Sequence, residues 1–230
     1  MKRQTSTGSC GLCRATFGKA AMTRHLQSCL KIREVPLAGP GGRPRRPVRI
    51  FHLVVAGRWS PGYWMHLAVP VERTLGDLDS FLRYTWLECC GHLSAFRIGT
   101  VSYDSGGMDE GESDGMESDL GSVLAPGTEF LHEYDFGTTT ELRLKVVGAR
   151  EGAGYGRDIE VLARNDPPDI RCEACNKPAT QVCSQCICDG PAWFCDKCAK
   201  QHECGEEMCL PVVNSPRVGM CGYTGPSTAW

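Results

Sequence analysis

The most regular hydrophobic pattern in the chain is an alternation over residues 139–147. Apolar side chains occupy every second position there, and charged side chains occupy most positions between them. This period of two is typical of a strand with one buried and one solvated face. We therefore expect a strand at 139–147 that pairs with the apolar run at 130–136. The alternating residues are Leu142, Leu144 and Val146 on the buried side and Glu141, Arg143 and Lys145 on the solvated side.

Earlier runs predict a hairpin and a helix. Residues 48–55 and 63–69 are rich in β-forming residues and are separated by glycine, serine and proline, which indicates a turn between two strands. Thr74 and Asp77 then form a capping-box pattern, and apolar residues recur every three or four positions up to Cys89. Residues 93–103 predict a further strand. The pattern indicates an α+β domain in which one main helix packs on an antiparallel sheet.

The segments on either side of this domain lack such patterns. Residues 35–47 are rich in glycine, proline and arginine, which is typical of a linker. Cysteine dominates the sequence from 166 onwards. We expect a small module at 1–34, the linker at 35–47, the α+β domain at 48–165, a second small module at 166–209 and a tail at 210–230.

Charge is segregated along the 230 residues, although the formal net charge is only -2. Residues 1–47 carry ten lysines and arginines against one glutamate, so this end is strongly basic. Residues 104–119 carry seven acidic residues and no basic one, among glycines and serines that offer no hydrophobic face. We expect that stretch to be a solvated acidic loop.

Cysteine usage predicts metal binding in a reducing compartment. The first thirty residues interrupt any apolar stretch with charged and metal-ligating side chains, and no apolar run reaches the roughly 18 residues of a spanning helix. The expected location is therefore the cytoplasm. The chain has 15 cysteines, and paired C-x-x-C spacing in a reduced protein favours metal over disulfides.

The amino-terminal module has the ligand spacing of a zinc finger. A tight turn supplies two cysteines, and two more ligands follow four residues apart, on one face of a helix. This order resembles a two-cysteine, histidine, cysteine finger, with a middle spacing one residue shorter than in the commonest DNA-reading fingers. The alternative is a set of scattered thiols in a flexible tail. The candidate ligands are Cys10, Cys13, His25 and Cys29.

Basic residues around the finger make nucleic acid, DNA or RNA, a candidate partner. Lysine and arginine bind phosphates regardless of sequence. The alternatives are a solvated basic tail and a finger that binds protein. The candidate contacts are Arg14, Lys19, Arg24, Arg43, Arg45 and Arg46.

The second module has eight potential ligands within residues 172–204, which is enough for two zinc ions. With the ion of the amino-terminal finger, we expect three zinc ions in the chain. A segment this short cannot build an apolar core, so metal must hold it together. Its order resembles a B-box-like cross-brace, in which alternate ligand pairs share an ion. That resemblance implies one site of Cys172, Cys175, Cys195 and Cys198 and a second of Cys183, Cys186, His202 and Cys204, with Cys209 or Cys188 as alternatives to Cys204. Four protein ligands leave no open position, which is typical of structural zinc.

Residues 48–163 resemble the plasmid pRiA4b ORF-3-like family. The resemblance rests on Tyr63–Trp64, Val69–Pro70, the 74–79 segment, Gly91–His92–Leu93 and Tyr134–Asp135–Phe136–Gly137, and the 210–217 and 221–223 segments resemble a subset of members. It implies a microbial protein, often associated with mobile elements, whose biochemical role is unassigned. The chain departs from the family after Gly137, where Thr138, Thr139 and Thr140 replace the usual acid, variable residue and tryptophan.

Three functions follow from these observations. The first is a non-enzymatic zinc-binding adaptor that contacts nucleic acid through its basic end and a protein through its second module. The second is a scaffold that binds protein alone. The third is an enzyme in the middle domain, where a cysteine and a histidine could form a nucleophile. The alternative to an enzyme is that these residues have structural roles. We expect Cys89 on the buried helical face, Cys90 packed beside it and His92 hydrogen-bonded at the helix end. His132 and Asp135 are the other reactive groups, and we expect Gly137 to supply the unusual backbone angles of a tight turn.

Overall fold

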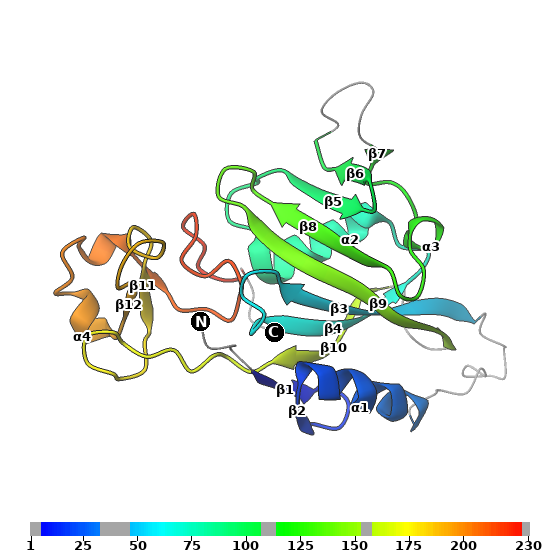
Figure 1. Cartoon of the computed structure of the whole chain (residues 1–230), viewed down its shortest axis with the longest axis horizontal. Helices are drawn as coiled ribbons and strands as arrows, with labels where there is room; N and C mark the ends of the chain where they lie inside the picture. The colour runs from blue at the N-terminus through cyan, green and yellow to red at the C-terminus, as the bar shows by residue number, and fades with distance from the viewer. Residues whose placement is uncertain (1–5, 33–46, 107–113, 153–157, 227–230) are drawn as a thin grey trace, which may run out of the picture.

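The computed structural model describes residues 6–32, 47–106, 114–152 and 158–226. Its main feature is a ten-stranded sheet in the order β2-β1-β10-β4-β3-β9-β8-β5-β6-β7, antiparallel except for the β6–β7 pair (Figure 1). This confirms the predicted α+β class. The strands of this sheet are β1 (Thr7–Cys10), β2 (Thr16–Gly18), β3 (Val48–Gly57), β4 (Trp64–Pro70), β5 (Ser94–Ile98), β6 (Val101–Asp104), β7 (Asp114–Gly115), β8 (Glu129–Tyr134), β9 (Thr140–Gly152) and β10 (Glu160–Asn165).

The two predicted hairpins are present. Strand β3 pairs with β4, and β8 pairs with β9, both antiparallel. The alternation in β9 has the predicted sense, because Leu142, Leu144 and Val146 are fully buried while Arg143 and Lys145 are exposed.

The predicted helix begins where expected but ends early. Helix α2 (Leu75–Leu82) has the complete capping box between Thr74 and Asp77. It continues as a π-helical turn, η1 (Arg83–Leu87), in which the amide of Glu88 bonds to the carbonyl of Arg83 five residues earlier. The wider turn ends the helical period, so Cys89 lies beyond the helix and the prediction that it belongs to the buried face is wrong.

The single strand predicted at 93–103 is also wrong. The segment forms two strands, β5 and β6, which pair with each other as a hairpin. Gly99 turns the chain between them with a φ of +61°, a conformation that costs glycine little.

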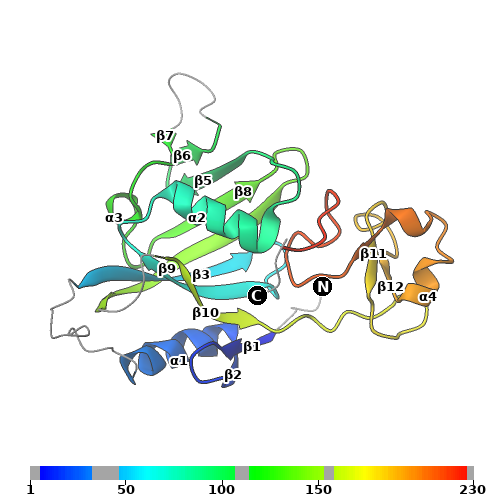
Figure 2. The same cartoon turned by 180° about the vertical axis from the view of Figure 1, so that it is seen from behind.

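Both faces of the central strands are covered, which explains why β4 is buried along its whole length. Helix α2 packs on one face, over side chains such as Phe51, Leu53 and Leu67. Helix α1 (Lys19–Ile32), from the amino-terminal segment, packs on the other face over Trp64 and Ala68 (Figure 2). Strand β1 pairs with β10, so the amino-terminal segment extends the main sheet. Its expected boundary at residue 34 lies outside the described residues.

The carboxy-terminal module is a small separate lobe (Figure 1). It has a three-stranded sheet in the order β12-β11-β13, built from β11 (Gln181–Cys183), β12 (Trp193–Phe194) and β13 (Cys209–Pro211). Helix α4 (Asp196–Ala199) and a 3-10 turn, η2 (Glu206–Met208), complete it. The chain then returns to the main sheet, where Val218 joins the hydrophobic core.

The acidic stretch at 104–119 lies partly within the described residues. Residues 107–113 lie outside the described part, as do the linker residues 35–46. After residue 113, β7 pairs with β6, Met116 is buried, and helix α3 (Leu120–Val123) follows. The expectation of a solvated loop is therefore wrong for its last residues. No helix in the described ranges is long and apolar enough to cross a membrane.

Candidate metal centres

The amino-terminal ligands meet at one point between the β1–β2 turn and α1. Cys10 and Cys13 come from the turn, and α1 supplies His25 and Cys29 one helical turn apart. The His25 Nε2 atom is 3.2 Å from the Cys13 Sγ atom, and the four ligand atoms all lie within 4.8 Å of one another. Phe17 stacks on the His25 ring with centroids 4.5 Å apart, which fixes the ring orientation.

This group belongs to a core shared with the sheet. Cys10 is fully buried and Cys29 almost so, beside Met22 and Leu26 of the helix and Trp64 of β4. Burial raises the pKa of the Cys29 thiol to about 11, which a bound cation would reverse. The finger therefore packs as part of the middle domain.

The carboxy-terminal ligands fall into two groups, and the groups alternate along the chain as in a cross-brace. The first contains Cys172, Cys175, Cys195 and Cys198, and the second contains Cys183, Cys186, His202 and Cys204. Within each group all ligand atoms lie within 4.8 Å of one another. The structure thus brings together the twelve residues expected as ligands, in the three expected sets. It places Cys204 in the last set, where Cys188 and Cys209 were the alternatives.

Backbone amides around these thiols favour the thiolate that binds metal. Burial would raise the pKa of Cys172, but hydrogen bonds from the amides of Cys195, Ala174 and Cys175 lower it to about 6. Cys183 behaves in the same way, with a pKa of about 7. Amides directed at sulfur are typical of turns that hold a structural metal.

The donor atoms of all three groups fit zinc. Thiolate and imidazole are its preferred ligands, and sets of four suit its tetrahedral geometry. Since each group supplies four protein ligands, the metal would have no open position for a substrate.

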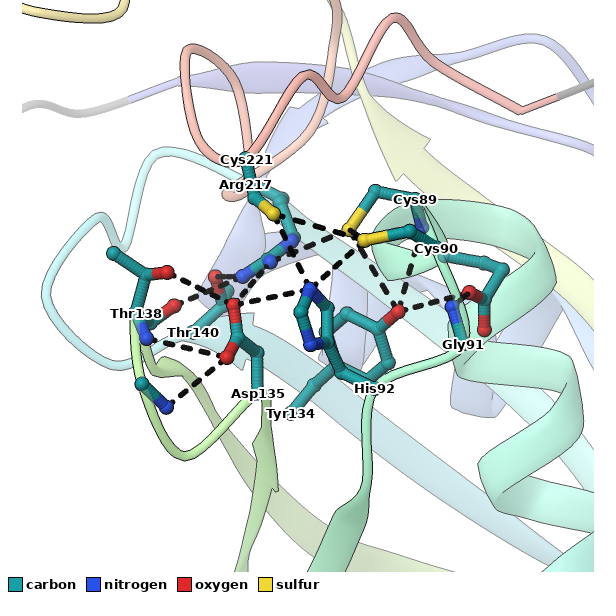
Figure 3. Close-up of polar contacts among 12 residues, drawn as sticks. Cys89, Cys90, Gly91, His92, Tyr134, Asp135, Thr138, Thr140, Arg217 and Cys221 are labelled. Atoms are coloured by element: carbon teal, nitrogen blue, oxygen red, sulfur yellow. Dashed lines mark hydrogen bonds and ion pairs between the residues drawn. The ribbon is translucent and has the colours of Figure 1, made fainter.

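A fourth group was not predicted. Cys89, Cys90, His92 and Cys221 also place their ligand atoms within 4.8 Å of one another (Figure 3). The expected packed role of Cys90 is wrong, because Cys90 is exposed and its Sγ atom lies 3.0 Å from His92 Nε2. One sequence signal was available. Five cysteines belonged to none of the predicted metal sites, and two of these, Cys89 and Cys90, are adjacent and closely precede His92.

Beside this group, the turn after β8 has an unexpected geometry. Asp135 has the left-handed φ of +66° that was expected of Gly137. The Asp135 carboxylate accepts hydrogen bonds from the amides of Gly137 and Thr138 and from the Thr138 hydroxyl. The buried guanidinium of Arg217 completes the set with a 2.7 Å contact. Burial would raise the pKa of Asp135, but these partners hold it well below its usual range.

The other reactive groups of the middle domain have structural partners. His132 is fully buried beneath α2, with its Nε2 atom 2.7 Å from Asp79 Oδ1. Asp135 is 3% exposed, and its carboxylate is bonded to protein groups.

The predicted nucleic-acid residues divide into two sets. Arg14, Lys19 and Arg24 belong to the finger, where Arg14 and Arg24 are exposed and Lys19 half-buried. Lys19 and Arg24 line a cavity of about 760 Å³ between α1 and the β3–β4 turn. Arg43, Arg45 and Arg46 lie outside the described residues.

Comparison with solved structures gives a structural similarity, and comparison of the sequence gives none. No family model matches the sequence, and no curated protein matches it. A crystal structure titled as a protein of unknown function, MM3350 from Methanosarcina mazei Go1, is similar at 17% identity with a TM-score of 0.46. The similarity covers 51% of this chain and 70% of that one. The sequence and its metal-binding side chains therefore supply the functional argument.

Proposed function

We propose that this chain is a non-enzymatic zinc-binding adaptor that contacts nucleic acid through its finger and a protein through its carboxy-terminal module. The observation that carries the nucleic-acid part is the cavity beside α1. Four basic side chains from three separated segments converge on it, among neutral neighbours. They are Lys19, Arg24, Arg58 and Arg143.

Two of these side chains are well placed for phosphate. Arg24 and Arg143 are exposed, and each comes from a regular element, α1 or β9, that fixes its backbone. Arg58 forms an ion pair with Glu141, which offsets part of its charge. A basic hollow of this kind favours the sugar–phosphate backbone over base edges, so we expect binding with little sequence preference.

The test is binding of labelled duplex DNA, single-stranded DNA and RNA to the zinc-loaded full chain over a series of salt concentrations. Each phosphate contact contributes a slope of about -0.9 for duplex DNA on a plot of log affinity against log salt. Arg24→Glu should weaken binding and reduce the size of that slope by about 1 or more. Lys177→Glu, an exposed lysine of the carboxy-terminal module, is the charge-matched control.

Two outcomes would contradict this part of the proposal. One is an affinity that does not fall as salt rises. The other is an equal loss of binding in Arg24→Glu and Lys177→Glu, which would mean that overall charge, and not the cavity, controls the interaction.

The second candidate function is a scaffold that binds protein alone. A largely apolar cavity of about 320 Å³ lies between the main sheet and the carboxy-terminal lobe, lined in part by Trp59, Trp193 and Val218. Trp59 is 71% exposed, and aromatic side chains of this kind often anchor protein partners. A nuclease-treated preparation that retains a defined partner, and loses it in Trp59→Ala, would favour the scaffold if nucleic acid does not bind.

The assignment of residues 48–163 to the pRiA4b ORF-3-like family remains part of this proposal. Its support is the set of matching segments in the sequence, including the Tyr134–Gly137 turn. That turn holds the buried Asp135–Arg217 pair, so it has a structural role in this chain.

A further inference from the structure

The fourth cysteine and histidine group has the geometry of a zinc site. Tetrahedral zinc, with bonds of about 2.3 Å to sulfur and about 2.0 Å to nitrogen, separates two sulfurs by roughly 3.8 Å and sulfur from nitrogen by roughly 3.5 Å. Here the Cys89 and Cys90 sulfurs are 3.6 Å apart, and those of Cys90 and Cys221 are 3.7 Å apart. The His92 Nε2 atom lies 3.2 Å from Cys221 Sγ.

The three expected sites provide an internal standard for these distances. Sulfur–sulfur separations in the carboxy-terminal module are 3.6 Å for Cys175–Cys195 and 3.5 Å for Cys186–Cys204. The sulfur–nitrogen separation at His25 is 3.2 Å. The fourth group is thus as well gathered as the groups whose spacing identifies them as zinc sites.

Two unusual backbone turns direct the ligands to one point. Gly91 has a φ of +79° and brings His92 back beside Cys90. Cys221 has a φ of +45°, a conformation uncommon for a residue with a side chain, between Gly219 and Gly222, which also have positive φ. Strained backbone of this type is retained where the position of a side chain matters, and here the positioned group is a thiol.

Two charged side chains lie beside the group: the Asp135 carboxylate, whose Oδ2 atom is 3.5 Å from His92 Nε2, and the Arg217 guanidinium that pairs with it. Zinc with three thiolates and a neutral imidazole has a net charge of -1. The buried guanidinium of Arg217 lies against it and donates to the Cys89 sulfur at 3.4 Å (Figure 3). Charged donors in this position orient a ligand and stabilise its negative charge.

We propose that Cys89, Cys90, His92 and Cys221 bind a fourth metal ion, Zn²⁺, which fastens the tail to the segment that follows η1. The ligands come from two segments about 130 residues apart, so the ion joins parts of the chain that no local motif connects. With four protein ligands it is a structural site. It closes a contact that the tail already makes through Ser215, whose hydroxyl donates to the carbonyl of Trp86 at 2.6 Å.

The experiment is the zinc content of the full chain, reconstituted under reducing conditions and measured by native mass spectrometry. The wild type should bind one more zinc ion than Cys221→Ser. The control variant, Cys188→Ser, should bind as many zinc ions as the wild type. Cys188 is exposed and belongs to none of the four groups. His92→Gln, which removes a ligand on the other segment, should also lose one ion. Agreement between the two ligand variants guards against a folding defect in either.

The difference between variants, and not the total, decides the result. A wild type with four ions and a Cys221→Ser chain with three support the site. A wild type with three zinc ions and a Cys221→Ser chain with two also support the site. In that case one of the other three groups does not bind zinc. Equal zinc content in wild type, Cys221→Ser and His92→Gln would overturn the proposal. So would a Cys90–Cys221 disulfide found by peptide mapping of protein kept under reducing conditions.

Discussion

Replacing Arg217 with methionine should strongly destabilise the fold, because this arginine is a fully buried cation in the tail. Its guanidinium contacts Asp135 Oδ2 at 2.7 Å, the carbonyl of Thr138 at 2.9 Å and the Thr140 hydroxyl at 3.0 Å. Methionine fills much of the same volume but donates no hydrogen bond. The substitution therefore leaves the Asp135 carboxylate buried without its countercharge.

The expected loss is about 3–5 kcal/mol, the usual cost of removing one partner of a buried ion pair. Asp135 keeps three hydrogen bonds from Gly137 and Thr138, which favours the lower end of this range. With a urea dependence of about 2 kcal/mol per molar, the unfolding midpoint should fall by roughly 1.5–2.5 M. Unfolding would be followed by far-UV circular dichroism in zinc-saturated, reducing buffer, with zinc content measured in parallel.

A double-mutant cycle separates the pair from the other contacts of Arg217. Asn tolerates the left-handed backbone of Asp135, so Asp135→Asn removes the charge with little strain. The double variant should be more stable than the sum of the single losses predicts, by about 2 kcal/mol. Additive losses, or a loss below about 1 kcal/mol in Arg217→Met alone, would refute the idea that this ion pair secures the tail.

Three other predictions concern the finger and the face of the sheet beneath it. The His52 and His66 rings are hydrogen-bonded at 2.9 Å, and burial lowers their pKa values in the folded protein to about 4 and about 3. In the unfolded chain a histidine has a pKa of about 6.5, so between pH 7 and 5.5 only the unfolded chain takes up these two protons. Stability should therefore fall by about 2 kcal/mol from pH 7 to 5.5, and by about half of that in His52→Gln, measured by urea unfolding with zinc present. Gly8→Ala should weaken the amino-terminal docking, because its Cβ would lie 2.7 Å from Asn165 Cα; faster amide exchange in β1 than in wild type would show it, and unchanged exchange would contradict it. Removing zinc with a chelator should expose Trp64, now 1% exposed, and shift tryptophan fluorescence to the red; Trp64→Phe should shift less, and equal shifts would exclude Trp64 as the source.

Local patterns in the sequence predicted the elements that depend on local physics. The alternation in β9 and the capping box at Thr74 each involve neighbours within a few residues, and both are present. The early end of α2 was not predictable from apolar spacing, because the π-helical turn changes the period without changing the residues. In the same way, the apolar content of 93–103 is compatible with one strand or two. Gly99 forms the turn between two strands only because β5 and β6 pair as a hairpin.

The metal groups show the same dependence on sequence separation. Each expected site contains at least one C-x-x-C pair, so most of its ligands are recognisable from spacing. The division of the carboxy-terminal ligands into two sets rested on the resemblance to a cross-brace, and it left Cys188 and Cys209 as alternatives to Cys204. The fourth group combines an adjacent cysteine pair and a histidine with a cysteine from the tail. Spacing cannot identify such a site, because its last ligand arrives only when the tail folds back on the sheet.

The tail therefore contributes more to the fold than its sequence indicates. Residues 210–230 lack a long apolar run, yet Arg217 reaches the turn after β8 and Cys221 reaches the segment after α2. These two contacts meet at the Arg217 guanidinium, which touches both Asp135 and the Cys89 sulfur. Loss of the fourth metal should therefore weaken the ion pair, and loss of the ion pair should weaken metal binding by the same free energy, because linkage between two equilibria is reciprocal. If Arg217→Met left the affinity for the fourth zinc ion unchanged, the two contacts would be independent and the tail would be held at two separate points.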